Sequence, residues 1–228
     1  MSPRYSVVQL GATGAVGGHV VHTLTQMPDV EQITLLGRRP LEGVPSDKIR
    51  QSVVDVFDPV SYRDDLDGHD HAICTLGVGQ PSKMDRADFV KIDKTAVLDF
   101  ASACKDAGVR HFELLGSVGA DPRSRSFYLR TKGELEEGLR ALSFERLTLV
   151  RPSMILTPTN RYGLSQAMTL AIWPVLSPVL LGRLKKYRGI AVDRLGKAIA
   201  LNLRGPARGV DVLHWEEIDA LALKSVAP

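Results

Sequence analysis

The 228-residue sequence has few of the residues that mark disulfide-rich, metal-binding or nucleic-acid-binding proteins. Its two cysteines, Cys74 and Cys104, have no paired or metal-type spacing, which disfavours a disulfide framework and favours a reducing compartment. Its six histidines include no H-x-x-x-H pair, and we expect no metal site. The net charge is only +3 and the basic residues are scattered, so the charge pattern does not predict a nucleic-acid partner.

The sequence also lacks an uninterrupted apolar run long enough to cross a membrane. Residues 167–182, AMTLAIWPVLSPVLLG, are uncharged, but they are shorter than the about 20 residues of a spanning helix and contain Pro174 and Pro178. The N-terminus has no charged region followed by a long apolar run, so we expect no signal peptide and a cytoplasmic protein. We expect the segment 167–182 to be buried or to line a pocket, with weak association with a membrane surface as the alternative.

Strand-like and helix-like segments alternate through the first 150 residues. Short apolar runs predict strands at 5–10, 33–37, 52–56, 71–77, 111–117 and 146–152, and helical patterns lie at 15–27, 89–108 and 126–141. This alternation predicts an α/β fold, a doubly wound parallel sheet of the Rossmann type with helices on both faces. We expect a single domain, 1–228, whose last part, 154–228, forms a small lobe or lid over the substrate cleft. That part contains a predicted helix at 192–203, a strand at 209–213 and a short final helix.

The segment GATGAVG, residues 11–17, closes the first predicted strand and opens the first predicted helix. Gly11 can make the tight turn, Gly14 lets backbone N–H groups approach a pyrophosphate, and Gly17 lets the helix pack close to the strand. The helix N-terminus adds orphan N–H donors and a partial positive charge. The alternative is a glycine-rich turn with no ligand. The predicted phosphate-binding residues are Gly11, Ala12, Thr13, Gly14, Ala15, Val16 and Gly17.

The end of the second predicted strand indicates which dinucleotide is bound. Arg38 and Arg39 stand where an NAD-selective site has an aspartate or glutamate. A guanidinium matches a ribose 2′-phosphate in charge and geometry, so we predict NADP(H) rather than NAD(H). The alternative is an ordinary solvated turn.

Further predicted cofactor contacts follow the third and fourth strands. Asp55 ends the third strand, where its carboxylate either accepts a hydrogen bond from the adenine amine or only initiates a turn. The fourth strand ends at the usual edge of the cofactor cleft. The other predicted contacts at these two strand ends are Val56, Leu76 and Gly77.

Tyr128 and Lys132 stand four residues apart on a predicted helix and therefore share a face. A lysine ammonium beside a phenol favours the phenolate, and such a phenol can exchange a proton with a carbonyl or alcohol oxygen near neutral pH. Ser117 ends the preceding strand, where its hydroxyl can polarise the substrate oxygen. The three residues are the predicted catalytic group. The alternative is an amphipathic helix with a packed tyrosine and a surface lysine.

Nearly the whole chain resembles the atypical short-chain dehydrogenases/reductases, within the Tat-interactive-protein-like, NmrA-like NADP-binding family. The segments that carry the resemblance are, in order, LGATGAVG, ITLLGRRP, VVDVFD, CTLG, FVKIDKTAVL, HFELLGSVGAD, FYLRTKGELEE, RLTLVRPSMIL and VDRLGKAI. The resemblance implies a Rossmann fold with bound NADPH, Tyr128 as acid/base, and Lys132 also holding the nicotinamide ribose. It implies that Arg151, Pro152 and Ser153 lie near the nicotinamide end.

The sequence departs from this family in two places. Asp93 stands where many members have asparagine, which puts the proton-relay role of that position in question. Ser117 and Tyr128 are also closer in sequence than in the better-known reductases, so a compact loop must bring them together.

We therefore expect an NADPH-dependent reductase of a small, apolar, carbonyl-like substrate. The second hypothesis is a non-catalytic NADP(H)-sensing protein that a partner recognises, because the family includes members better known as regulators. The third is a sugar-nucleotide epimerase, for which the short C-terminal part leaves little room.

Overall fold

A seven-stranded parallel sheet runs through the protein in the order β3-β2-β1-β4-β5-β6-β9. The computed structural model describes residues 4–157, 179–206 and 208–227. The strands of the sheet are β1 (Tyr5–Leu10), β2 (Val30–Gly37), β3 (Ile49–Val53), β4 (His71–Cys74), β5 (His111–Leu115), β6 (Arg146–Val150) and β9 (Gly209–Leu213). The strand order reverses between β1 and β4, and ligands of such sheets bind outside the carboxyl ends of the strands at this point.

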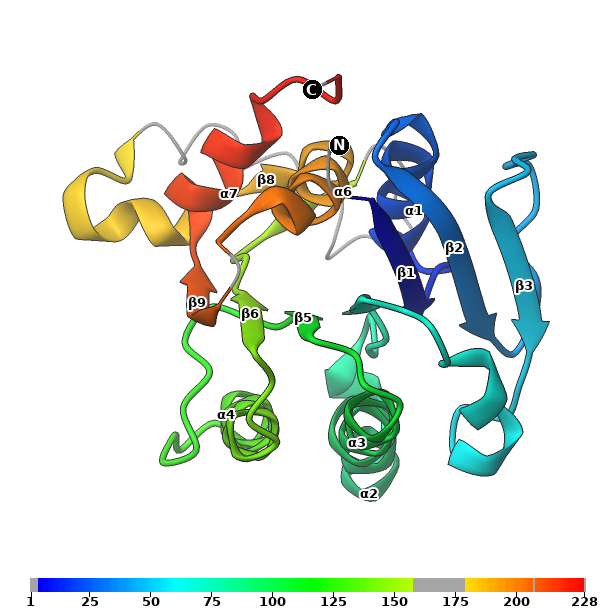
Figure 1. Ribbon diagram of the computed structural model, residues 1–228. Helices are drawn as coiled ribbons and strands as arrows, with labels where there is room; N and C mark the ends of the chain where they lie inside the picture. The colour runs from blue at the N-terminus through cyan, green and yellow to red at the C-terminus, as the bar shows by residue number, and fades with distance from the viewer. Residues whose placement is uncertain (1–3, 158–178, 207, 228) are drawn as a thin grey trace.

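Helices cover both faces of the sheet (Figure 1). One face carries α1 (Gly17–Gln26), α6 (Val192–Leu201) and α7 (Trp215–Ala222), and the other carries α2 (Arg86–Val90), α3 (Ala96–Asp106) and α4 (Phe127–Ala141). Each layer buries its own apolar core against the sheet. Because the central strands are covered on both faces, most of their residues are apolar, with a few buried polar side chains such as Gln9 and Glu113. The predicted doubly wound α/β fold is confirmed.

Most observed strands and helices begin or end one to three residues from their predicted bounds, and two elements differ in a more informative way. The strand expected at 52–56 lies at Ile49–Val53, and Val54 and Val56 are buried beyond its end, where the Val54 N–H still donates to the Gly37 carbonyl of β2 at 3.0 Å. The helix expected at 89–108 starts earlier and has three parts: α2, a π-helical turn at Lys91–Thr95, and α3.

The expected C-terminal lobe is largely part of the Rossmann unit. Strand β9 pairs in parallel with β6, and α6 packs so closely on α1 that a Cβ on Gly196 would lie 2.5 Å from the Cβ of His19. A two-stranded parallel sheet, β7 (Ile155–Leu156) with β8 (Ile190–Ala191), adds to this region. The described residues of 154–228 therefore extend the sheet and its helical layer within the same domain, and the expected cover over the substrate cleft stays a prediction.

The apolar segment predicted to line a pocket, 167–182, lies outside the described residues except for 179–182. Among the residues that the structure does describe, no helix is long and apolar enough to span a membrane. The short 3-10 segments are Pro59–Ser61, Arg63–Asp65, Pro81–Lys83, Gly182–Tyr187 and Asn202–Arg204.

Candidate functional site

The glycine turn connects the end of β1 to the start of α1. Gly11 has a φ of 93°, a left-handed conformation that favours glycine, and a Cβ there would lie 2.6 Å from the backbone nitrogen of Leu76. A Cβ on Gly17 would overlap the carbonyl oxygen of Gly11 and lie 2.8 Å from the Thr75 hydroxyl. Gly14 is exposed. The turn thus runs against the end of β4 with no room for side chains at two of its glycines.

Two polar side chains that the sequence analysis did not single out hold this turn. Thr75 Oγ1 donates to the Gly11 carbonyl at 3.1 Å, and Gln9 Nε2 donates to the Gly17 carbonyl at 3.1 Å. Gln9 is fully buried within β1. A glutamine inside an otherwise apolar strand, two residues before the turn, is the signal that could have identified it.

A hollow of about 340 Å³ opens beside the glycine turn. It is lined by Leu10, Gly11, Thr13, Gly37, Arg38, Arg39, Val56 and Leu76. Both arginines are exposed, and within the described residues neither guanidinium has a hydrogen bond or an ion pair. The first turn of α1 has no acidic residue and no side-chain cap, so its positive end is free for an anion. These residues fit a dinucleotide whose phosphates meet the glycine turn.

Asp55 takes the turn-forming role in this structure. Its Oδ1 accepts a hydrogen bond from the backbone N–H of Phe57 at 2.9 Å, and the side chain is exposed. The wall of the hollow at this point is formed by the neighbouring Val56, which is buried.

Ser117, Tyr128 and Lys132 come from the end of β5 and the first turns of α4. The connecting loop folds back on the helix: the Asp121 N–H donates to the Leu129 carbonyl at 3.2 Å, and Arg130 donates to the Ser124 carbonyl at 3.0 Å. Within the described residues no hydrogen bond joins the three side chains to one another. Ser117 Oγ donates to the neighbouring Val118 carbonyl at 3.4 Å, and the ring of Tyr128 lies 5.7 Å from that of Phe89.

Lys132 is buried and forms an ion pair with Asp93. Asp93 lies in the π-helical turn, and its other carboxylate oxygen accepts a hydrogen bond from the Val78 N–H at 2.7 Å. A Cβ placed on Gly77 would lie 3.3 Å from Asp93 Oδ1 and 4.0 Å from Lys132 Nζ. The loop after β4 therefore borders the charged pair.

The segment after β6 contacts the same region through its backbone, while Arg151 points to a carboxylate. The Arg151 guanidinium donates to both oxygens of Glu136 on α4, with Nε–Oε1 at 2.9 Å. The buried Pro152 accepts a hydrogen bond from the Val118 N–H at 3.0 Å, and Ser153 is half-buried. Arg151 thus has an internal partner, which the sequence analysis missed because Glu136 lies on a different element.

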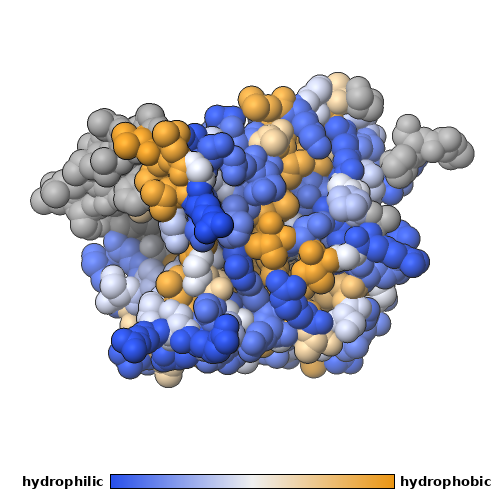
Figure 2. Space-filling view, turned by 90° about the vertical axis from the view of Figure 1, so that its left-hand side faces the viewer, coloured by the Kyte–Doolittle hydropathy of each residue, from blue (hydrophilic) through white to orange (hydrophobic). Residues whose placement is uncertain are grey.

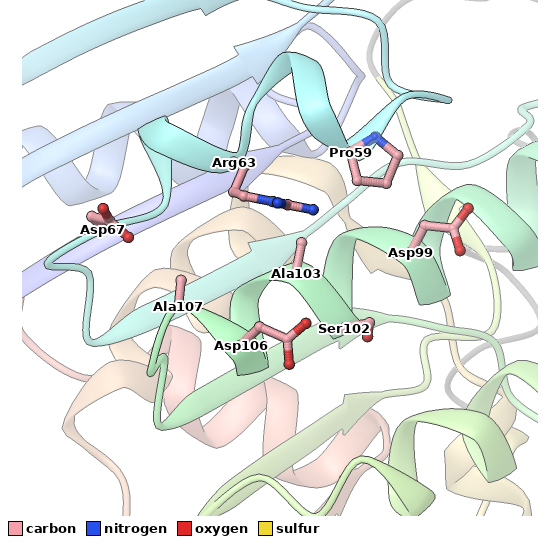
Figure 3. Close-up of a pocket in the computed structure, with 8 residues that line it drawn as sticks. All are labelled: Pro59, Arg63, Asp67, Asp99, Ser102, Ala103, Asp106 and Ala107. Carbon is pink, nitrogen blue, oxygen red and sulfur yellow. The ribbon is translucent and has the colours of Figure 1, made fainter.

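A second hollow, of about 500 Å³, lies between α3 and the segment 59–67 (Figure 3). It is lined by Pro59, Arg63, Asp67, Asp99, Ser102, Ala103, Asp106 and Ala107. Three carboxylates against one guanidinium disfavour a phosphate ligand. None of these residues belongs to the predicted site.

A family model described as NAD(P)H-binding matches residues 11–169, which include the glycine turn, the arginine pair and the catalytic candidates. The chain belongs to this NAD(P)H-binding family. The relatives below agree with the resemblance to the NmrA-like, atypical short-chain dehydrogenases/reductases. As a member of this family, the chain binds NAD(P)H and has an oxidoreductase-like fold.

Curated relatives in this NAD(P)H-binding family match about two thirds of the chain. Protein HTATIP2 of Rattus norvegicus is 37% identical over 153 residues, which cover 66% of this chain and 63% of that protein. Protein fmp52, mitochondrial, of Emericella nidulans is 32% identical over 155 residues, 66% of each chain. The expectation of a cytoplasmic protein is contradicted by the fungal relatives, which are named mitochondrial.

Solved structures share the fold at lower identity. MoeE5 in complex with UDP-glucuronic acid and NAD superposes with a TM-score of 0.71 at 20% identity, covering 91% of this chain and 75% of MoeE5. UDP-N-acetylglucosamine 4-epimerase from Methanobrevibacter ruminantium M1 gives a TM-score of 0.69 at 18% identity, covering 93% and 77%. These likenesses agree with the Rossmann architecture.

Proposed function

We propose that the protein is an NADP(H)-preferring oxidoreductase that reduces a small carbonyl compound. The observation that carries this proposal is the hollow that joins the glycine turn to the exposed guanidinium groups of Arg38 and Arg39. Two guanidinium groups at this edge match the double charge of a ribose 2′-phosphate.

The residues around the cleft have separate roles in this proposal. Bound NADPH supplies the hydride. The glycine turn holds the pyrophosphate, Lys132 holds the nicotinamide ribose, and Arg38 and Arg39 hold the 2′-phosphate. Tyr128 gives its phenolic proton to the carbonyl oxygen as that oxygen gains charge, and Ser117 donates a hydrogen bond to the same oxygen.

The nucleotide preference can be measured by fluorescence titration. We expect NADPH to bind at least about tenfold more tightly than NADH, since one charge-assisted hydrogen bond accounts for about that factor. Replacing both arginines, Arg38→Ala with Arg39→Ala, should remove the preference by weakening NADPH alone. Arg208→Ala, at an exposed arginine on the far edge of the sheet, is the control. Equal affinities of the wild-type protein for NADPH and NADH would refute the preference.

The proton-donor role of Tyr128 can be tested with a panel of small aldehydes and ketones. Tyr128→Phe should lower kcat by about 100-fold or more, the scale of general acid catalysis, and leave the Kd for NADPH unchanged. The control is Tyr187→Phe, at an exposed tyrosine outside the cleft. Turnover by Tyr128→Phe at the wild-type rate would reject the mechanism.

The second candidate is a nucleotide-sensing protein without catalysis. The ion pair of Lys132 with Asp93 supports it, because this pair occupies the lysine expected to assist Tyr128. A nucleotide-sensing protein would bind NADPH tightly but would not oxidise it in the presence of any aldehyde or ketone of the panel, whereas a reductase would.

The proposal extends to the location of the protein in the cell and to its association with a membrane surface. The names of the fungal relatives support a mitochondrial location, which fractionation of cells expressing the tagged protein tests.

The side of the molecule in Figure 2 shows apolar side chains beside hydrophilic ones. Leu181 and Leu184, which are 65% and 52% exposed, flank the exposed Arg183, and this supports weak association with a membrane surface. Cosedimentation with phosphatidylserine-containing vesicles tests it.

A further inference from the structure

Two hydrogen-bond donors from opposite sides of the cleft converge on Asp93. The Lys132 ammonium reaches its Oδ1 from α4, and the Val78 N–H reaches its Oδ2 from the loop after β4. The carboxylate side chain is only 2% exposed and that of Lys132 only 6%. A buried carboxylate is costly unless it is paired and hydrogen-bonded, and both of its oxygens are satisfied here.

An aspartate suits this position better than an asparagine would. A carboxylate offers two acceptor oxygens, whereas an amide offers one oxygen and one NH₂ group that can only donate. Because both partners of Asp93 are donors, an asparagine would turn its NH₂ group toward one of them. The position therefore requires an acid when Lys132 and Val78 are both to be held.

The local backbone places this carboxylate. Asp93 lies in a π-helical turn between α2 and α3, and such turns are rare and often occur at functional sites. Without a side chain at Gly77, the Asp93–Lys132 pair is bordered by backbone on that side.

We propose that Asp93 is a positioning residue that fixes the Lys132 ammonium for the nicotinamide ribose and ties the loop after β4 to α4. This inference rests on the proposed function, in which Lys132 holds that ribose. Asp93 acts through Lys132 and contacts neither the hydride-bearing ring nor the carbonyl.

The test compares two nucleotides that differ at the ribose in question. NADPH contains the nicotinamide ribose, and adenosine 2′,5′-bisphosphate ends before it. Asp93→Asn should weaken NADPH binding about tenfold and leave the affinity for adenosine 2′,5′-bisphosphate unchanged. In a Lys132→Met background, Asp93→Asn should have no further effect on NADPH.

A neighbouring ion pair provides the matched control. Lys94, also in the π-helical turn, pairs with Glu134 on α4 at 2.7 Å, and both side chains are about a third exposed. Glu134→Gln breaks a link between the same two elements outside the cleft, so we expect wild-type affinity for both nucleotides. Backbone amide exchange at Val78 should rise in Asp93→Ala, which keeps no acceptor.

Three results would overturn the proposal: wild-type NADPH affinity in Asp93→Asn, a parallel loss for both nucleotides, or a further loss in the Lys132→Met background. Failure of the proposed function is a separate result. In that case the wild-type protein would turn over none of the carbonyl compounds. The affinities for NADPH and adenosine 2′,5′-bisphosphate would still test the role of Asp93.

Discussion

At the scale of single residues, Gly17 and Gly18 are adjacent in sequence but differ in the space around them. A Cβ on Gly17 would meet the Gly11 carbonyl, the Thr75 hydroxyl and the Cα of Ala12, two of them backbone groups. A Cβ on Gly18 would lie 3.6 Å from the Ala12 carbonyl, which is ordinary van der Waals contact. The requirement for glycine at position 17 is therefore one of close packing.

This difference predicts opposite effects of the same substitution. Gly17→Ala should lower the free energy of unfolding by about 1–3 kcal/mol, the cost of overpacking, and should abolish NADPH binding because the turn must move. Gly18→Ala should raise the free energy of unfolding by about 0.5–1 kcal/mol, because alanine favours the helix, and should leave binding intact. Urea unfolding and fluorescence titration measure both. Equal stability of the two variants would contradict the packing argument.

At the scale of elements, the Arg151–Glu136 pair links the segment after β6 to α4. The Glu136 side chain is 3% exposed and that of Arg151 19%, and two hydrogen bonds join them. Removing one member of such a pair leaves a buried charge without its counter-ion. The pair therefore holds the helix that bears Tyr128 and Lys132 against the sheet.

We expect Glu136→Gln to lower the free energy of unfolding by about 3 kcal/mol, and the double substitution Glu136→Leu with Arg151→Met to recover most of the loss. A double-mutant cycle in urea measures the coupling. If Arg151 acted only on the cofactor, the single substitution at Glu136 would leave stability unchanged and this prediction would be wrong.

The bounds of some strands and helices could be predicted from the sequence, and those of others could not. Strands β1 and β9 lie at the predicted residues, because each is a short apolar run bounded by turn residues. The strand expected at 52–56 was displaced because apolar residues are buried beyond the end of β3 in the same core. The sequence of the π-helical turn, Lys91–Thr95, contains no hydrophobic pattern that distinguishes it from an α-helix.

The residues of the candidate site were likewise predictable from the sequence only in part. Local motifs predicted the glycine turn and the arginines that line one hollow. The partners of Lys132 and Arg151, namely Asp93 and Glu136, depend on how α3, α4 and β6 pack together, and no spacing in the sequence encodes this. The roles assigned to Ser117, Tyr128 and Lys132 stay predictions.

At the scale of the whole molecule, a buried polar network crosses the sheet beneath α6. Glu113 on β5 is fully buried; one of its oxygens accepts from Asn202 at 3.0 Å, and the other has no partner among the described residues. Arg146 donates to the carbonyl and side-chain oxygens of Asn202. Burial raises the pKa of Glu113 to about 8, and burial lowers the pKa of the nearby His71 to about 4.

These shifts predict opposite effects of pH on stability. Between about pH 4.5 and 8 the folded chain keeps a proton on Glu113 that the unfolded chain has lost, so this group lowers stability by about 1.4 kcal/mol per pH unit as pH rises. Between about pH 6.5 and 4 the unfolded chain protonates His71 while the folded chain does not, so stability also falls as pH falls.

Glu113→Gln removes the fall in stability that Glu113 causes as pH rises. We expect the free energy of unfolding of this variant, relative to the wild-type protein, to rise steadily from pH 5 to pH 8. Glu137→Gln, at an exposed glutamate on α4, should show no such trend. Parallel pH curves for the wild-type protein and Glu113→Gln in urea unfolding would show that Glu113 does not titrate in this range.

The π-helical turn also sets the rotational phase between α2 and α3. A single residue added to a regular helix rotates everything beyond it by about 100°, whereas the wider i→i+5 turn at Lys91–Thr95 accommodates such a residue locally, and a regular α-helix resumes at Ala96. Pairwise alignments with relatives that have a regular helix here should consequently need a one-residue gap between 91 and 95.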